Sequence, residues 1–234
     1  MVQTDVPPRP ETFARREASS RPKIQRAGPL SAHFKGLAAQ LFMPAADSPS
    51  PQAIGITSCG HGEGVSSVAV NLAMCAAGLA RSVVLVQVQM SRPAEISLQC
   101  SATPGLREFV TGSATIVECI HGVADGAFAV IPAGEAIGDD DLFASAETVT
   151  ALLEGLRSEY DCIILDLPCL SENGSCLQWA RQLDGIVLVI ASEQLPRSEA
   201  VARLSQLEKV GAKVLGAVIN QSRRYLPSWL DRRL

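Results

Sequence analysis

The sequence predicts an α/β fold, a three-layer arrangement in which a mainly parallel sheet carries helices on both faces, preceded by a disordered basic tail. Three observations predict it. From residue 53 onward, short apolar runs alternate with helical segments, which is typical of βαβ units. A glycine-rich turn follows the first of these runs. Residues 1–29 hold five prolines and few bulky apolar side chains, so they cannot bury enough surface to order themselves.

The segment 30–52 comes next in the chain. Apolar side chains recur at helical spacing over residues 30–42 and predict a short amphipathic helix that docks on the domain. Residues 43–52 follow as a linker rich in proline and serine. The third region, residues 53–234, is expected to fold as the α/β domain.

The elements of that domain follow in order. Apolar runs rich in β-branched residues, several of them bounded by proline or glycine, predict strands at 54–57, 83–88, 127–131, 162–167, 186–191 and 214–219. Helical periodicity predicts helices at 67–80, 148–158 and 197–210. The 67–80 helix is small and apolar almost all round, so we expect it to be buried. Consecutive apolar strands separated by helices imply parallel pairing.

Charge is distributed unevenly along the chain. Residues 1–36 hold seven basic and three acidic residues, a net charge of +4, and the whole chain carries −4, so the rest carries −8. An acidic body argues against nucleic acid as its partner. The basic tail can lie near anionic lipid or an acidic partner, or it can be solvated without contacts, and the sequence leaves both open.

Targeting signals and cysteines bear on the compartment. No apolar run approaches the roughly 20 residues of a membrane-spanning helix, and the N-terminus lacks the apolar stretch of a secretory signal. The seven cysteines are odd in number, and Cys162, Cys169 and Cys176 are spaced too widely for the paired ligands of a zinc site. We therefore expect a cytoplasmic protein with buried thiols.

The strongest local signal is the segment 58–67 between the first strand and the first helix. Its glycines allow successive backbone N–H groups to surround anionic oxygens at the start of a helix, where the partial positive charge favours them. The residues that would bind a nucleotide in this way are Gly62, Glu63, Gly64, Ser66 and Ser67. Val65 stands where such a loop supplies a lysine for the β and γ phosphates. A glycine-rich turn without a ligand is the alternative interpretation.

Several motifs together resemble one family. The order Gly62–Glu63–Gly64–Val65–Ser66, then 86–93 (VQVQMSRP), then 163–168 (IILDLP) resembles the cytoplasmic domain of the bacterial tyrosine kinases, or BY-kinases. These kinases belong to the MinD/ParA-like class of deviant P-loop ATPases. The likeness runs from about residue 30 to residue 234 and implies a P-loop NTPase-like fold.

The resemblance also implies roles for individual residues. The family's loop lysine and two Walker A′ aspartates correspond to Val65, Gln87 and Gln89, so no catalytic residue is expected at these positions. Ser66 and Asp166 are retained and imply a weak magnesium site. Asn220 matches the position that contacts adenine in related ATPases, although it can equally be a strand-end residue bonded to its own loop. Binding of ATP or ADP with Mg²⁺, without hydrolysis, stays open.

The implied function is that of a catalytically degenerate BY-kinase-like subunit of bacterial exopolysaccharide or capsule biosynthesis and export. Its partner by resemblance is a membrane polysaccharide co-polymerase, which would hold the protein at the cytoplasmic side of the inner membrane. The family's ring-forming helix reads E-x-x-R-x-x-R, whereas this chain has Ala32, Lys35 and Ala38 there. Any homo-oligomer is therefore expected to differ from the family's ring.

Two alternatives stay open. One is an active tyrosine kinase or ATPase in which Arg92, or an arginine from a partner, replaces the missing lysine, with Tyr225 as a phosphate acceptor near the C-terminus. The other is a MinD/ParA-like positioning ATPase at a membrane surface.

Overall fold

The fold is described from a computed structural model of the 234-residue chain. The structure describes residues 30–43, 50–79, 81–88, 103–123, 127–135, 144–171, 174–192 and 196–221. The expected tail at 1–29 lies outside these residues, as do Gln89, Arg92 and Tyr225.

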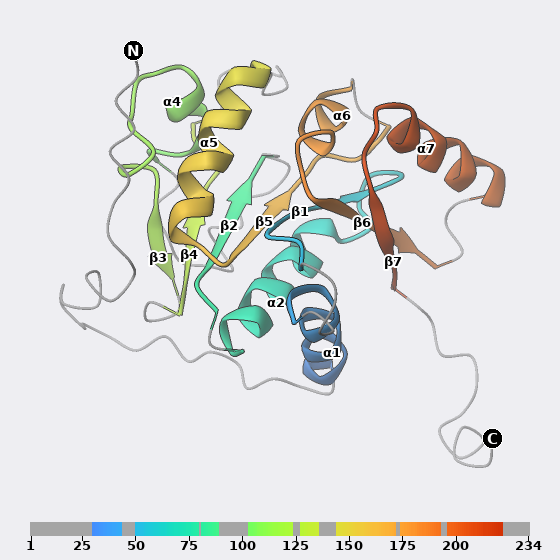
Figure 1. Cartoon of the computed structure of the whole chain (residues 1–234). Coiled ribbons are helices and arrows are strands. Elements are labelled where there is room, and N and C mark those ends of the chain that lie inside the picture. Colours follow the sequence, from blue (N-terminus) through green and yellow to red (C-terminus); the bar gives the residue numbers. More distant parts are fainter. Residues whose placement is uncertain are drawn as a thin grey trace.

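A seven-stranded sheet forms the centre of the molecule, in the order β3-β4-β2-β5-β1-β6-β7 (Figure 1). Every neighbouring pair is parallel except β3 and β4, which are antiparallel. The prediction of a mainly parallel sheet is confirmed. The strands are β1 (Ala53–Ser58), β2 (Val83–Gln87), β3 (His121–Val123), β4 (Phe128–Ile131), β5 (Cys162–Asp166), β6 (Gly185–Ala191) and β7 (Val214–Asn220).

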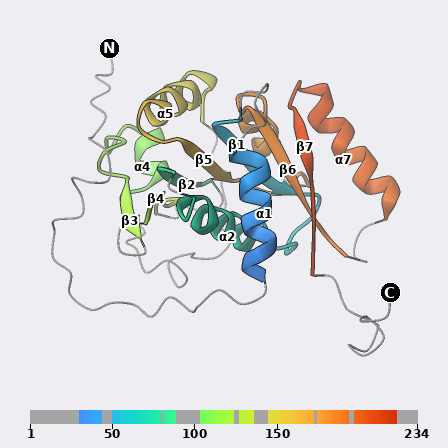
Figure 2. The same ribbon diagram turned by 60° about the horizontal axis from the view of Figure 1, so that its bottom comes forward.

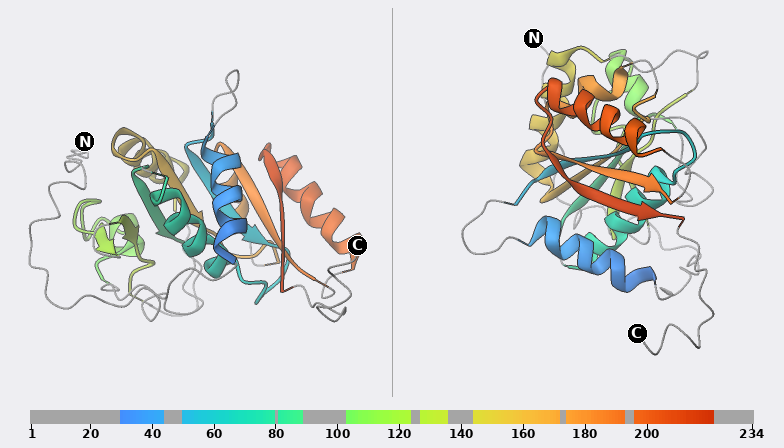
Figure 3. Two further views of the ribbon diagram at one scale, coloured as in Figure 1. Left: turned by 90° about the horizontal axis from the view of Figure 1, so that it is seen from below. Right: turned by 90° about the vertical axis from the view of Figure 1, so that its right-hand side faces the viewer.

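Helices cover both faces of this sheet. Two of them, α1 (Leu30–Phe42) and α2 (Val65–Ala77), lie together on one face, as Figures 2 and 3 show. The other face carries α4 (Leu106–Val110), α5 (Ala146–Glu159), α6 (Ser175–Ala180) and α7 (Arg197–Lys209). The predicted three-layer arrangement is confirmed. No helix in the described part of the chain is both long and apolar enough to span a membrane.

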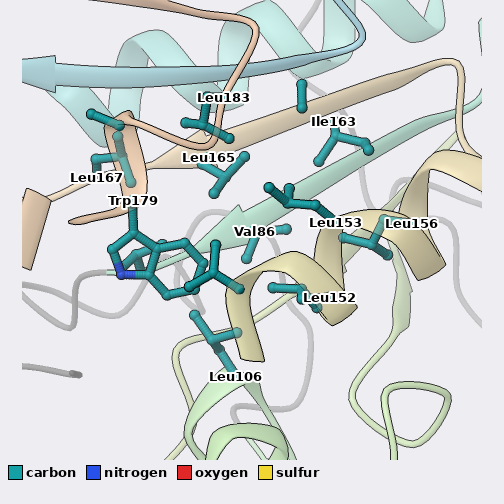
Figure 4. Close-up of a cluster of buried hydrophobic side chains, with 14 of the residues drawn as sticks. Val86, Leu106, Leu152, Leu153, Leu156, Ile163, Leu165, Leu167, Trp179 and Leu183 are labelled. Atoms are coloured by element: carbon teal, nitrogen blue, oxygen red, sulfur yellow. The ribbon is translucent and has the colours of Figure 1, made fainter. Parts of the chain in front are cut away.

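Alternating side chains of the strands divide the core into two clusters. Val83 and Leu85 of β2 point into the cluster under α1 and α2, whereas Val84 and Val86 point into the opposite one. Figure 4 shows this second cluster, in which the buried Trp179 of α6 lies among leucines of α5 and β5. Because both faces are covered, the strands are continuously apolar, as expected of a parallel sheet.

Most expected elements form within a few residues of their predicted bounds. The helix predicted at 30–42 forms over those residues and packs against α2, with Ala38 and Phe42 buried. The helix predicted at 67–80 begins at Val65 and ends at Ala77. The sequence did not predict β3, α4 or α6, which have three, five and six residues. Segments this short carry too little periodicity to be recognised.

The parallel strands bring distant residues to one edge of the sheet. Since β1, β2, β5, β6 and β7 run in the same direction, their carboxyl ends lie along a common edge. That edge holds the loop after β1, Gln87, Asp166 and Asn220. Ligands of open α/β sheets bind at such edges, and the candidate site lies here.

Candidate phosphate-binding site

The loop of residues 59–64 joins β1 to α2 and has the backbone of an anion-binding turn. Gly62 and Gly64 have φ angles of 76° and 90°, in the left-handed region that glycine tolerates. Gly64 is the residue that caps the start of α2, and no side chain caps this helix. A Cβ atom at Gly64 would collide with the side-chain amide of Asn220. Both glycines are therefore required by the geometry of the loop.

The N–H groups at the start of α2 are open. Within the described residues, the N–H groups of Glu63, Gly64, Val65 and Ser66 donate no hydrogen bond to another residue. Unpaired N–H donors at the first turn of a helix favour an anion. The loop predicted from the sequence is thus present with its donors free.

Glu63 has its side chain committed to the loop itself. Its carboxylate is 3% exposed and accepts hydrogen bonds from the N–H groups of Cys59 at 3.0 Å and Gly60 at 3.3 Å. These bonds close the beginning of the loop. What Glu63 can offer a ligand is therefore its backbone N–H group.

Val65 is packed into the apolar core. It is 9% exposed and joins the cluster of α1 and α2. A valine side chain carries neither charge nor hydrogen-bond donor. This position therefore contributes to packing and supplies no cation.

Ser66 and Asp166 lie together at the base of the loop. The Ser66 hydroxyl donates a hydrogen bond to the Asp166 carboxylate. Asp166 is 1% exposed, and its Oδ1 atom has no hydrogen-bond partner among the residues that the structure describes. Burial raises the pKa of Asp166 to about 7, against the opposing effect of the Ser66 hydrogen bond. Near neutral pH, a substantial fraction of this carboxyl group is protonated.

Gln87 occupies the strand next to Asp166. The two residues pair in register across β2 and β5, and Gln87 is 7% exposed. An amide oxygen is a neutral, weak metal ligand and cannot act as a general base. Gln89, the second position of this kind, lies outside the described residues.

The magnesium ion implied by the fold has two protein oxygens at hand. The unpartnered Oδ1 of Asp166 and the adjacent Ser66 hydroxyl are hard ligands that suit Mg²⁺, which otherwise keeps water or phosphate oxygens. Among the residues that the structure describes, no group of three or more His, Cys, Asp or Glu side chains could hold a metal ion. The residues present fit a sparsely ligated cation.

Asn220 contacts the loop directly. Its Nδ2 atom donates to the carbonyl oxygen of Glu63 at 2.8 Å. The next residue, Gln221, donates from Nε2 to the carbonyl oxygen of Gly62, also at 2.8 Å. The structure thus brings Asn220 to the loop after β1. Sequence reasoning missed Gln221, and an amide side chain just after a strand end was its sole local signal.

The thiols near the site are buried and unreactive. None of the six cysteines in the described ranges forms a disulfide bond, and all but Cys75 are buried, in agreement with the sequence-based prediction. Burial raises the pKa of Cys59 to about 11, and the charge of Glu63 adds to the rise. A thiol with so high a pKa is a poor nucleophile near neutral pH.

Solved structures share this fold. The chimerical protein CapA2B2 is 26% identical, with a TM-score of 0.74, over 86% of this chain and 88% of that chain. The kinase domain of Escherichia coli tyrosine kinase ETK is 20% identical, with a TM-score of 0.75, over 94% and 92%. The septum site-determining protein MinD with Mg-ADP from Pyrococcus horikoshii is 19% identical, with a TM-score of 0.63, over 77% and 76%. The chain therefore has the fold of the MinD-like P-loop ATPases.

Proteins of similar sequence indicate which members of this structural class the chain is related to. Tyrosine-protein kinase CpsD of Streptococcus agalactiae is 24% identical over 181 residues, 76% of this chain and 79% of that protein. Tyrosine-protein kinase YwqD of Bacillus subtilis is 25% identical over 166 residues, 70% of each. The succinoglycan biosynthesis transport protein ExoP of Rhizobium meliloti is 26% identical over 72% of this chain, which matches 22% of ExoP. No protein-family model matches the chain. The chain is a homologue of the bacterial tyrosine-protein kinases.

Proposed function

We propose that this protein is a catalytically degenerate BY-kinase-like subunit that supports exopolysaccharide or capsule biosynthesis and export in bacteria. Its partner is a membrane polysaccharide co-polymerase, which holds it at the cytoplasmic side of the inner membrane. The homologous tyrosine-protein kinases and the succinoglycan transport protein support this assignment. Its biological role is then assembly with that partner.

Two observations carry the proposal of lost catalysis. The residue in the lysine position, Val65, is packed in the apolar core, and Gln87 stands in register with Asp166 where the family has a carboxylate. Phosphoryl transfer depends on positioning and on neutralisation of the developing charge. Loss of one charge-stabilising group at comparable sites lowers the rate by about 10²–10³. With several such losses, the remaining rate would be too low for catalysis to be the role of this protein.

Binding of a nucleotide is a separate matter from its turnover. The open N–H groups of Glu63, Gly64, Val65 and Ser66 can hold phosphate oxygens. Ser66 and Asp166 would hold Mg²⁺, which when bound neutralises phosphate charge. Without the lysine, an ionised Asp166 repels a nearby phosphate, so we propose that ATP and ADP bind weakly.

Turnover of radiolabelled ATP tests the proposal. The purified protein is incubated with Mg²⁺ and the candidate co-polymerase, and hydrolysis and phosphoryl transfer are compared with those of a Ser66→Ala/Asp166→Ala control. We expect rates equal to the control. Transfer to Tyr225 or hydrolysis clearly above the control would contradict the loss of catalysis and favour an active kinase. ATP-dependent dimers that bind liposomes would favour a positioning ATPase instead.

A further inference from the structure

We infer that the end of β7 sets the direction of the loop's N–H donors, and that Asn220 and Gln221 are positioning residues for anion binding. The part of this inference that concerns binding rests on the proposed phosphate-binding role of the loop. These two residues, which we call the β7 clamp, hold consecutive carbonyl groups of the loop. Asn220 holds the carbonyl of Glu63 and Gln221 that of Gly62, each at 2.8 Å.

Peptide geometry links these carbonyls to the donors. In a trans peptide the C=O and the following N–H are coplanar and point in opposite directions, and among the described residues the one cis bond is Thr103–Pro104. The carbonyl of Gly62 therefore fixes the N–H of Glu63, and the carbonyl of Glu63 fixes the N–H of Gly64. Both carbonyls are drawn to β7, so both N–H groups point away from it. These are two of the donors left open in the loop.

The backbone conformation of the loop and that of the end of β7 both fit the contact between them. Gly64 can have no Cβ because the Asn220 amide occupies that space. Gln221 has a φ of 55°, and within the described ranges no other non-glycine residue has a positive φ. A left-handed conformation costs such a residue about 1–2 kcal/mol, so the surrounding structure must hold it there. Pairing of β7 with β6 does so, since the Asn220 carbonyl accepts a hydrogen bond from Ser192 at 2.9 Å.

The clamp orients the loop without adding charge. Both side chains are neutral amides, and each donates a hydrogen bond to a loop carbonyl. Asn220 therefore acts through the loop backbone, with its Nδ2 bound to Glu63. Replacing both clamp residues should make the N–H groups of Glu63 and Gly64 more mobile, while the net charge of the site stays unchanged.

Backbone dynamics of the ligand-free protein test the clamp. The variant Asn220→Ala/Gln221→Ala is compared with wild type and with Gln40→Ala, a matched loss of an amide on the exposed face of α1. We expect ¹⁵N order parameters at residues 62–65 to fall from about 0.85 to below about 0.6 in the double variant, with β4 unchanged. Should the double variant fail to fold, Gln221→Gly removes one amide and accepts the positive φ.

Binding of two probes completes the test. Calorimetric titration with ADP and with inorganic pyrophosphate should show affinities about 5–30-fold weaker in the double variant than in wild type or Gln40→Ala. Unchanged order parameters in the loop of the double variant would overturn the positioning role of the β7 clamp, whatever the affinities. A double variant whose loop is more mobile but which binds both probes as tightly as wild type would overturn it as well. If the loop loosens and wild type binds neither probe, the orienting role is supported and the proposed phosphate-binding role fails.

Discussion

At the scale of single residues, Asp166 has the least favourable surroundings in the site. Its carboxyl group is almost completely buried. Within the described ranges, the Ser66 hydroxyl is its hydrogen-bond partner and Oδ1 has none. Burying an ionised carboxylate with so few partners is costly. The protein lowers this cost by protonation, because burial raises the pKa of Asp166 to about 7.

We expect Asp166→Asn to stabilise the protein increasingly as the pH rises. Between pH 4 and pH 7 the unfolded chain has released the proton that folded Asp166 retains, so the free energy of unfolding of the wild type falls across this window. Asparagine has no such dependence. The free-energy difference between variant and wild type should grow by about 1–4 kcal/mol from pH 4 to pH 7 and then level off. Denaturant unfolding at several pH values measures it, and a constant difference would contradict the buried, protonated carboxyl group.

Val65 is the second residue whose chemistry can be isolated. We expect Val65→Lys to bind ATP about 10–100-fold more tightly than wild type, because a charge-assisted hydrogen bond contributes about 1.5–3 kcal/mol. Turnover should stay at background, since Gln87 and Gln89 still lack the carboxylates. Val65→Met is the control, because methionine is long and unbranched like lysine but carries no charge. Equal affinities of the two variants in calorimetric titrations would show that the position does not face phosphate.

At the scale of elements, the contact between α1 and α2 bears on assembly. The helix that resembles the family's ring-forming helix packs on its own domain, with Ala38 fully buried and Ala32 exposed. Arg81 adds a hydrogen bond to the carbonyl of Phe42 at 2.9 Å. An arginine in the family's position would have to enter this contact. The small residue at position 38 and the docking of the helix are thus physically connected.

We expect Ala38→Arg to destabilise the protein by about 2–4 kcal/mol, because a charged side chain would replace a methyl group in a packed helix contact. Ala32→Arg is the matched control and should stay within about 0.5 kcal/mol. Chemical denaturation of both variants measures the difference. Equal stability of the two would mean that α1 does not dock in solution as it does in this structure.

The opposite edge of the sheet is held by a different contact. Asp184 pairs with Arg157 at 2.7 Å and accepts the N–H groups of Gln52 and Ala53, each at 2.8 Å. It thereby connects α5 to the beginnings of β1 and β6. Burial opposes ionisation, but the hydrogen bonds from Arg157, Ala53 and Gln52 outweigh it and lower the pKa of Asp184.

We expect Asp184→Asn to cost about 1–3 kcal/mol of stability at pH 7. Because the pKa of Asp184 is lowered in the folded state, its stabilising effect is fully present above the pKa of the carboxyl group in the unfolded chain, about 4. The effect is lost as the pH falls through the pKa of the folded state. The cost should therefore shrink below about pH 4. Thermal unfolding across this range tests it, with the exposed Glu154→Gln as control. A cost that is the same at pH 7 and pH 3 would exclude the ion pair as its origin.

At the scale of the whole molecule, the sequence predicted the parts of the fold that have strong periodicity. Apolar strands and long helices identified a parallel sheet covered on both faces, because burial on two sides makes such strands continuously apolar. Segments such as β3, with its residues His121–Val123, escaped because a three-residue antiparallel edge strand has no pattern of its own. Its pairing with β4 depends on tertiary contacts.

The parts of the site that depend on local sequence signals could also be predicted. Glycines and a helix start identified the loop, and the resemblance supplied Asp166. The contacts of Asn220 and Gln221 with the loop span 157 and 159 residues, so no local spacing could indicate them. The burial of Val65 likewise follows from the packing of α1 and α2. Long-range packing therefore decides what each residue of the loop can do.

The fate of bound ATP tests the central claim most directly. The protein is mixed with a limiting amount of γ-labelled ATP, Mg²⁺ and the candidate co-polymerase, and the label is followed over hours as ATP, free phosphate and phosphoprotein. The proposed loss of the cation and carboxylates predicts that the nucleotide stays ATP as long as it does with the Ser66→Ala/Asp166→Ala control. Conversion to phosphate or phosphotyrosine clearly faster than in the control would show that this site is catalytic.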